Sequence, residues 1–354
     1  MPRRSDDAPH QGSLFAQSPA EHALAVVDAA DRSDLSGLAA SLHPLIHLGT
    51  SSWTFPGWTG LVYSAEHKQD RLARHGLAAY AHHPLMRTVG LDRAFYTPPR
   101  QEEFRELAGL TPPTFRFVVK AHQAVTRPDA DERGGTFGDT AAHRSSGIDN
   151  PRFLDAEYAR DIIIAPADRG LGARLGVILF QFPPLDLSRT SRIGPAARFI
   201  ARLAEFLGAL PPGPRYAVEV RNRELLGTDH AGAYARCLRE AGALHGYVHH
   251  PTMPTLDRQA RIMTDAGWAP AAGRAVCVRW LLRHDQTYEG ARTRYQPFRE
   301  IIDEDPHALT EVARLLEIAV DRGLPAFVVI NNKAEGSAPR SVERLAQAIR
   351  QRAV

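Results

Sequence analysis

Two residues of opposite charge, Lys120 and Glu219, are the first candidates for chemistry in this sequence. Only three of its 43 basic residues are lysines, and Lys120 is one of them. Exposed Lys and Arg are nearly exchangeable, so a Lys that persists in an Arg-rich chain indicates a need for a compact charge or a transferable proton. Glu219 and Arg221 stand two residues apart in a strand-like segment and therefore share one face. We expect Lys120 and Glu219 to be catalytic, with Glu219 as a general acid or base.

The charged residues Lys120, Glu219 and Arg221 could also have a purely structural role. A Lys held beside arginines loses its proton more easily and could act as a base or a nucleophile, while Arg221 binds an anionic group. Lys120, Glu219 and Arg221 could instead form buried ion pairs that only neutralise one another, since a buried Arg often does no more than pair with a carboxylate. The sequence leaves both interpretations open.

Other polar and aromatic residues at the ends of predicted strands are candidates for substrate binding. Asn331, Asn332 and Lys333 could donate hydrogen bonds to a phosphate, a carboxylate or a sugar hydroxyl, or could cap a loop. Trp53 and Tyr96 could stack on a base or a sugar, or pack in the core. The expected substrate-binding set also includes Asp92, Gln181, Arg221 and Arg279.

A metal site is a weaker hypothesis. His249 or His250, with Asp92, His122 and Glu219, could hold a divalent metal, as a sugar-isomerase-like enzyme would require. No tight metal-binding motif supports this set, and adjacent His side chains on a strand face opposite ways, so only one of the two could bind. We therefore predict neither a metal site nor a cofactor.

The elements that must position these residues alternate along the chain. Strands are expected at 45–51, 86–92, 114–121, 175–182, 215–221, 243–249, 275–282 and 325–331. Helices are expected at 69–82, 100–109, 151–164, 193–210, 229–241, 255–266, 306–321 and 341–352, with a loop at 283–299. Strands that alternate with helices, without a Gly-rich phosphate-binding motif, predict a single closed parallel (β/α)8 barrel over residues 44–354. The strand ends of such a barrel converge on one mouth.

Two segments depart from this alternation. Residues 1–43 are polar and non-periodic, which predicts a disordered tail with one short helix near 20–30. The insertion at 122–150 could form a mobile cationic loop over the mouth, or a solvated loop without a role. Within the tail, the pentapeptide Gln11-Gly12-Ser13-Leu14-Phe15 resembles the peptide by which bacterial DNA-metabolism proteins dock on the replicative sliding clamp. Gln11, Ser13, Leu14 and Phe15 therefore make the clamp a candidate partner.

The composition excludes several classes of protein. Hydrophobic residues make up 44% and charged residues 23%, as in ordinary globular proteins. Cys237 and Cys277 are too few for a disulfide framework or a four-thiolate metal site. Neither a long apolar run nor a secretory signal is evident, so we expect a cytoplasmic protein without a membrane span. The net charge of +3 is weak evidence for an anionic partner.

Short motifs at the strand ends resemble one protein family. They are Gly49-Thr50-Ser51-Ser52-Trp53, Pro56-Gly57-Trp58, Ala94-Phe95-Tyr96, Phe115-Arg116-Phe117-Val118-Val119-Lys120, Gly176-Val177-Ile178-Leu179-Phe180-Gln181-Phe182-Pro183-Pro184, Arg215-Tyr216-Ala217-Val218-Glu219-Val220-Arg221, Asn331-Asn332 and Gly336-Ser337-Ala338-Pro339. Together they are similar to the YecE-like family, domain of unknown function 72, across about residues 45–350. The resemblance implies a triosephosphate-isomerase-type barrel and supplies no reaction.

The chain also departs from the pattern of that family at two strands. The second strand has Val89-Gly90-Leu91-Asp92 where the family typically has Val-Glu-Ile-Asn, so one acidic group of the pocket is missing. The seventh strand has Arg279-Trp280-Leu281 in place of Arg-Leu-His. A mechanism that depends on that Glu and that His does not transfer to this chain.

We expect an enzyme, a hydrolase or lyase, that acts on a phosphorylated or otherwise anionic substrate, with a link to nucleic-acid metabolism as one form of the hypothesis. The expected ligand is a small anion or a nucleic acid. Two alternatives stay open: a non-catalytic binding or adaptor module recruited through its tail, and the metal-dependent sugar-isomerase-like enzyme.

Overall fold

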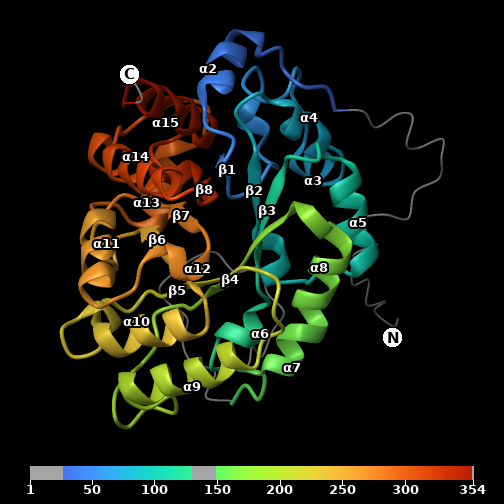
Figure 1. Ribbon diagram of the computed structural model, residues 1–354. Helices are drawn as coiled ribbons and strands as arrows, with labels where there is room; N and C mark the ends of the chain where they lie inside the picture. Colours follow the sequence, from blue (N-terminus) through green and yellow to red (C-terminus); the bar gives the residue numbers. More distant parts are fainter. Residues whose placement is uncertain (1–26, 130–148, 353–354) are drawn as a thin grey trace, which may run out of the picture.

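Eight parallel strands close into a barrel. The computed structural model describes residues 27–129 and 149–352 (Figure 1). The strands are β1 Ile46–Thr50, β2 Thr88–Leu91, β3 Arg116–Lys120, β4 Leu175–Gln181, β5 Tyr216–Glu219, β6 Leu244–His249, β7 Val276–Trp280 and β8 Ala326–Ile330. Each strand pairs in parallel with the next, and β1 pairs with β8 from Ile46 opposite Ala326 to Thr50 opposite Ile330. The predicted closed (β/α)8 barrel is confirmed.

Helices surround the ring of strands (Figure 1). They are α2 Ser36–Ser41, α3 Gln69–His75, α4 Leu77–His82, α5 Gln101–Gly109, α6 Gln123–Thr126, α7 Ala156–Ala159, α8 Ala165–Leu171, α9 Ala196–Gly208, α10 Ala231–Glu240, α11 Leu256–Asp265, α12 Pro270–Gly273, α13 Tyr288–Tyr295, α14 Pro306–Asp321 and α15 Ala338–Arg352. The first and last of these, α2 and α15, pack against each other. In the described part of the chain no helix is both long and apolar enough to cross a membrane.

Apolar side chains form two cores, as expected when one face of each strand lines the barrel and the other meets helices. The large core lies between strands and helices. The interior apolar cluster fills the barrel with Val118, Val177, Leu179, Ala217, Leu244, Ala275, Cys277, Phe327 and Val329. Because side chains alternate along a strand, the residues two positions further on also face the interior. These are Lys120, Gln181, Glu219, Arg279 and Asn331, at the carboxyl ends of their strands.

The strand bounds agree with those expected within two residues, whereas several helices differ. The helix expected at 69–82 is two helices, α3 and α4, which meet at Gly76. The expected loop at 283–299 contains α13, whose polar and weakly amphipathic sequence carries little helical signal. The helix expected at 151–164 begins at Ala156 and continues through a π-helical turn into α8.

Residues 27–43 belong to the folded body, which corrects the expected disordered tail of 1–43. Ala29 bridges to Tyr63, and Leu38 of α2 is buried. Arg32 forms an ion pair with Glu343 of α15 at 2.7 Å. A short helix, α2, lies at 36–41, and most of the expected helix near 20–30 falls outside the described residues. The pentapeptide 11–15 and residues 130–148 of the insertion lie outside the described residues.

Candidate functional site

A fully buried carboxylate, that of Glu219, lies at the centre of the mouth. Arg221 Nε donates a hydrogen bond to its Oε1 at 2.8 Å, and Arg279 Nη1 on β7 donates to its Oε2 at 3.1 Å. Gly246 on β6 leaves room for it, since a Cβ there would lie 3.2 Å from the Cβ of Glu219. Burial alone would raise the pKa of Glu219, but Arg279 and Arg221 hold it below its usual value. Glu219 is therefore ionised at neutral pH.

Arg279 connects Glu219 to a second carboxylate. Its Nη2 donates to Asp92 Oδ2 at 3.1 Å. Asp92 follows β2 and shares a face with Gly90. A Cβ on Gly90 would lie 3.1 Å from Val329 Cγ1, so the barrel has little room for a side chain there. Gly90 stands where the family typically has Glu, so the chain lacks that acidic group. Asp92, two residues further on, provides a carboxylate for Arg279.

Lys120 faces the same space from the end of β3. Its Nζ lies 3.8 Å from the centre of the Phe95 ring, a contact that favours the charged ammonium. The charge of Lys120 also contributes to lowering the pKa of Glu219, after the larger effects of Arg279 and Arg221. Phe95 was not among the predicted site residues. Its only signal in the sequence is its place in the Ala94-Phe95-Tyr96 motif.

Arg221 has hydrogen-bonding capacity that the fold does not use. Its Nη2 lies 2.7 Å from the Glu219 oxygen that Nε already contacts, yet it makes no hydrogen bond to any described residue and is buried. Lys120, Arg221 and Arg279 bring cationic side chains to this space, and Glu219 and Asp92 pair with the two arginines. Since the buried Nη2 donor of Arg221 is poorly aligned with Glu219, an anionic ligand that accepted a hydrogen bond from it would be stabilised.

Three more predicted residues lie at the rim. Gln181 is buried and stands in register with Glu219 on the neighbouring strand. Asn331 lies near Ser51, with its Nδ2 3.4 Å from Ser51 Oγ, and its Oδ1 accepts the backbone N–H of Lys333 at 3.0 Å. Tyr96 is 39% exposed, with its ring edge-on to Phe95. These placements leave Gln181 and Asn331 facing the mouth and Tyr96 beside it.

Two other predicted residues, Asn332 and Trp53, are buried and form hydrogen bonds within the protein. Asn332 is buried, and its Oδ1 accepts hydrogen bonds from Trp58 Nε1 at 3.2 Å and from the backbone N–H of Ala338 at 2.8 Å. Trp53 is also buried, with Nε1 donating to the carbonyl of Leu72 at 3.0 Å. Asn332 and Trp53 thus stabilise the loops that follow β8 and β1.

Lys333 lies further out, with Nζ 4.2 Å from the centre of the Tyr288 ring on α13. A cavity of about 190 Å³ lies between the ends of β1 and β2, and Ser51, Trp53, Asp92 and Arg93 are among its lining residues. It adjoins the Asp92–Arg279 contact and extends the mouth toward β1.

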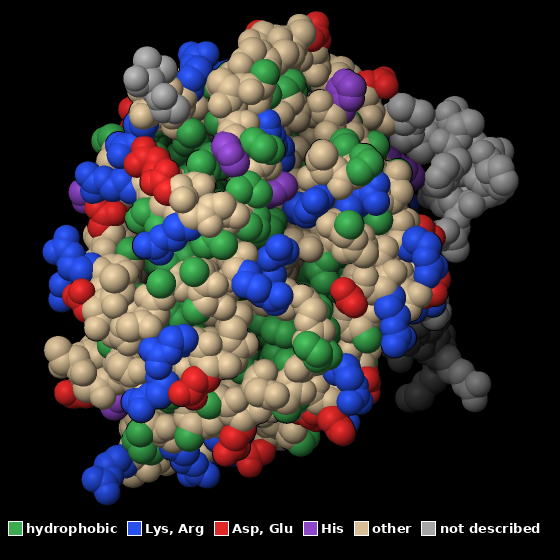
Figure 2. Space-filling model, viewed as in Figure 1, with side chains coloured by type: hydrophobic (Ala, Val, Ile, Leu, Met, Phe, Trp, Pro, Cys, Tyr) green, Lys and Arg blue, Asp and Glu red, His purple; other side chains and the backbone are tan. Residues whose placement is uncertain are grey.

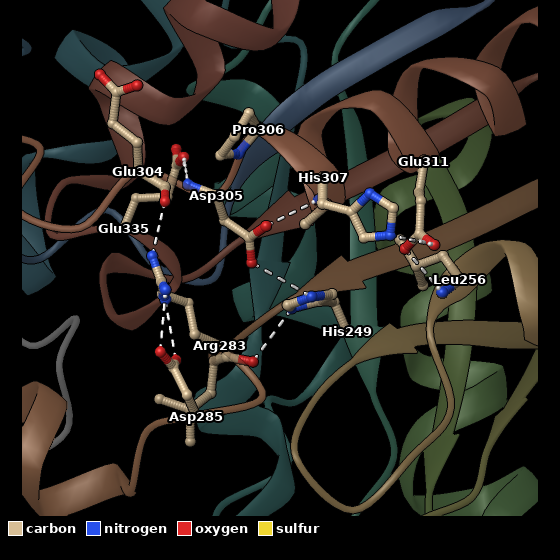
Figure 3. Close-up of polar contacts among 12 residues, drawn as sticks. His249, Leu256, Arg283, Asp285, Glu304, Asp305, Pro306, His307, Glu311 and Glu335 are labelled. Atoms are coloured by element: carbon tan, nitrogen blue, oxygen red, sulfur yellow. Dashed lines mark hydrogen bonds and ion pairs between the residues drawn. The ribbon is translucent and has the colours of Figure 1, made fainter.

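A second polar cluster lies on the outer side of β6 (Figure 3). His249 Nε2 lies 3.5 Å from Asp305 Oδ2, and its Nδ1 lies 3.1 Å from the carbonyl of Leu282. The backbone N–H of Asp305 in turn donates to Glu335 at 2.8 Å. Burial lowers the pKa of His249, which keeps the imidazole neutral at pH 7. The cluster joins β6 to α14 and to the segment after β8, and His249 does not face the mouth.

The residues considered for a metal are dispersed. His249 lies on the outer side of the barrel, and His122 Nδ1 lies 2.9 Å from the Tyr158 hydroxyl. Across residues 27–129 and 149–352 no group of three or more His, Cys, Asp and Glu side chains is placed to hold a metal ion.

A closed parallel β/α barrel with charged side chains at the carboxyl ends of its strands defines the class of this protein. The sequence matches the family described as "Protein of unknown function DUF72" over residues 47–354, and the chain belongs to that family. This confirms the family resemblance seen in the strand-end motifs.

Solved structures of the family share the fold. A DUF72 family protein from Enterococcus faecalis is 15% identical, with 88% of this chain and 98% of that chain covered and a TM-score of 0.52. A DUF72 family protein from Thermotoga maritima is 20% identical, with 87% and 98% covered and a TM-score of 0.52. No curated protein matches the sequence. At these identities the similarity supports the barrel fold alone.

Proposed function

We propose that the mouth of the barrel binds a phosphorylated or otherwise anionic substrate and that Lys120 takes part in its conversion. The main support is the cationic lining of the mouth, where Arg221 Nη2 lies 2.7 Å from Glu219 Oε1 and is not aligned to donate a hydrogen bond to it or to another described residue. This arginine belongs to a set in which the cationic side chains of Lys120, Arg221 and Arg279 reach the same space at the mouth. Arginine suits this role because its planar fork matches the oxygens of a phosphate or a carboxylate.

In this proposal Glu219 positions the cations. Both of its oxygens already accept hydrogen bonds from Arg221 or Arg279, and its pKa is lowered, so it has no proton to donate. Lys120 is the better candidate for proton transfer, since its Nζ faces the mouth, 3.8 Å from the centre of the Phe95 ring. An ammonium next to a bound phosphoester could protonate the leaving oxygen or stabilise developing negative charge. The reaction class would be hydrolysis or elimination at a phosphoester.

A substrate screen with matched variants tests the proposal. The wild-type protein is assayed against a panel of phosphomonoesters, phosphorylated sugars and nucleotides. For any compound that is converted, we expect Lys120→Met to lower kcat/KM by about 100-fold or more, because proton transfer typically contributes that much. Arg221→Met should mainly raise KM. Lys68→Met is the control, since Lys68 is exposed just before α3. Conversion by both variants at the wild-type rate would refute the proposal.

The second candidate function is an adaptor recruited through the tail. The observation that favours it is the pentapeptide of Gln11, Ser13, Leu14 and Phe15, whose Leu-Phe pair suits docking into an apolar groove. This candidate requires a cytoplasmic location. Purified sliding clamp immobilised on beads should retain the wild-type protein. It should not retain the double variant Leu14→Ala with Phe15→Ala. Equal retention of both proteins would eliminate the adaptor.

A further inference from the structure

Arginines occur at the amino-terminal ends of five strands. They are Arg87 before β2, Arg116 in β3, Arg174 before β4, Arg215 before β5 and Arg274 before β7. Because all strands run in parallel, these positions lie at the end of the barrel opposite to the mouth. Figure 2 shows Lys and Arg side chains near the middle of the visible face, over the region where β4 and α12 lie in Figure 1.

Carboxylates do not balance this arginine ring. In the part of the chain that the structure describes, none of the five forms an ion pair with Asp or Glu. Arg87, Arg116, Arg174 and Arg274 donate to backbone carbonyls instead, for example Arg87 Nη2 to Ala39 at 2.6 Å and Arg174 Nη2 to Thr111 at 3.0 Å. Arg215 Nε is buried and has no hydrogen-bond partner among the described residues.

Three side chains at this end point toward the barrel axis. His47, Arg116 and Arg215 lie two residues before Gly49, Val118 and Ala217, and Val118 and Ala217 belong to the interior apolar cluster. The His47 ring stacks on Phe327 of the same cluster, with ring centres 5.1 Å apart and an angle of 12° between the planes. Burial first, and then Arg116, Arg87 and Arg215, lower the pKa of His47 to about 4. All three side chains thus face the barrel axis at its amino-terminal end, and the two inner arginines act electrostatically on the imidazole.

This inner group has polar atoms without partners. His47 is only 7% exposed, and its buried Nδ1 makes no hydrogen bond to a described residue. Burial lowers the pKa of Arg215, and Arg274 and Arg116 lower it further. Arg116 and Arg215 are only partly buried, so solvent and solutes can reach them. At this end of the barrel an imidazole with an unused ring nitrogen thus faces the axis together with two arginines that have no carboxylate partner among the described residues.

We propose that His47, Arg116 and Arg215 form a binding site for a phosphate-sized oxyanion at the amino-terminal end of the barrel. Two guanidinium groups can each offer a pair of N–H donors to such an anion, and its charge would balance the arginine ring. The shared chemistry is the phosphoryl group, either as free phosphate or as the end of a larger molecule. The interior apolar cluster separates this site from Lys120 and Glu219, so it is independent of the proposed function of the mouth.

Titration with inorganic phosphate tests this site, with pyrophosphate as a separate arm for a phosphoryl group that is part of a larger molecule. Isothermal titration is run against sodium chloride of equal ionic strength. We expect one anion per chain, and a Kd at least about 10-fold weaker in Arg116→Gln with Arg215→Gln, the loss of one or two charge-assisted hydrogen bonds. Arg314→Gln with Arg352→Gln removes the same charge from arginines that have carboxylate partners, and it should bind as wild type.

Further outcomes separate this site from the mouth. Lys120→Met should retain the phosphate affinity of the wild type, and an equal loss in that variant would place the anion at the mouth and overturn the inference. Wild-type affinity in the double variant, or no difference between phosphate and chloride, would also overturn it. If the double variant does not fold, the imidazole signals of His47 in the wild-type protein provide the test by NMR. They should shift with phosphate and not with chloride, and unchanged signals would contradict the site.

Discussion

The two ends of the barrel handle positive charge in opposite ways. At the carboxyl end, Arg221 and Arg279 surround Glu219, and Arg279 also contacts Asp92. At the amino end, the arginine ring has carbonyl partners and no carboxylates among the described residues. A buried arginine needs either a fixed counter-charge or a diffusible one. The mouth therefore has a fixed, preorganised charge arrangement, while the other end depends on what the solution supplies.

The difference has consequences for substitutions. Removing a charge at the mouth breaks a buried pair and leaves its partner uncompensated. Removing a charge from the arginine ring relieves repulsion between like charges. The same type of substitution should therefore change the free energy of unfolding in opposite directions at the two ends.

The largest effect is expected for Glu219→Gln. The change keeps the shape of the side chain but leaves Arg221 and Arg279 without their shared carboxylate. We expect a loss of about 3–5 kcal/mol in the free energy of unfolding, as for other broken buried pairs. Urea denaturation measures it. Glu317→Gln is the control, because its partner Arg352 lies on the surface and the pair is exposed. Similar losses in the two variants would mean that the mouth is not a tightly coupled charge cluster.

The second-largest effect is expected at the amino-terminal end of the barrel, where His47 should make the free energy of unfolding depend on pH. The folded-state pKa of His47 is about 4, below its unfolded value, so the unfolded chain binds more protons between pH 6.5 and 4. Stability is fully present above pH 6.5 and falls as the pH drops toward 4, by up to about 3 kcal/mol for this residue. In phosphate-free buffer, His47→Gln should flatten that part of the curve of unfolding free energy against pH. An unchanged slope would show that the pKa of His47 is the same in the folded and the unfolded protein.

Gly90→Ala should have a moderate effect at the mouth. The added Cβ would lie 3.1 Å from Val329 Cγ1 and 3.3 Å from Ser51 Cα. Overpacking of this kind costs about 1–3 kcal/mol, which a thermal melt would show. Gly109→Ala is the matched control, since nothing lies within 4 Å of a Cβ at that position. If both variants melt together, the barrel interior beside Asp92 is less tightly packed than the structure indicates.

The smallest effect is expected for Arg215→Gln. Arg215 Nε has no partner, and Arg116 and Arg274 repel its charge. We expect a gain of less than about 1 kcal/mol at low salt, since exposed and half-buried charges contribute little, and the gain should shrink as salt screens the repulsion. Urea denaturation at two salt concentrations measures it. A clear loss of stability would show that the arginine has an essential packing role.

The sequence predicted the fold because the strands are short, strongly apolar segments. Leu175–Gln181 is an unbroken apolar run apart from its last residue, as expected for a strand buried on both faces. Helix α13 was not predicted, because its residues are largely polar and their spacing has no clear helical period.

Part of the site could also be predicted. Glu219 and Arg221 share a face of one strand, so alternation alone brings them together. The contact of Arg279 with Glu219 joins residues 60 positions apart, and only the closed barrel defines it. Phe95 lies in the Ala94-Phe95-Tyr96 motif, which does not reveal its contact with Lys120, and the arginine ring becomes visible as an Arg at the start of five strands only once the strand starts are known.

The bridge between Ala29 and Tyr63 restricts the reach of the amino-terminal segment. Tyr63 belongs to the loop that follows β1, on the same side as the mouth. Eleven residues lie between Phe15 and Val27, and a chain of that length spans at most about 40 Å. A partner captured by the pentapeptide would therefore be tethered within that distance of Val27, and its local concentration there would exceed that of a freely diffusing molecule.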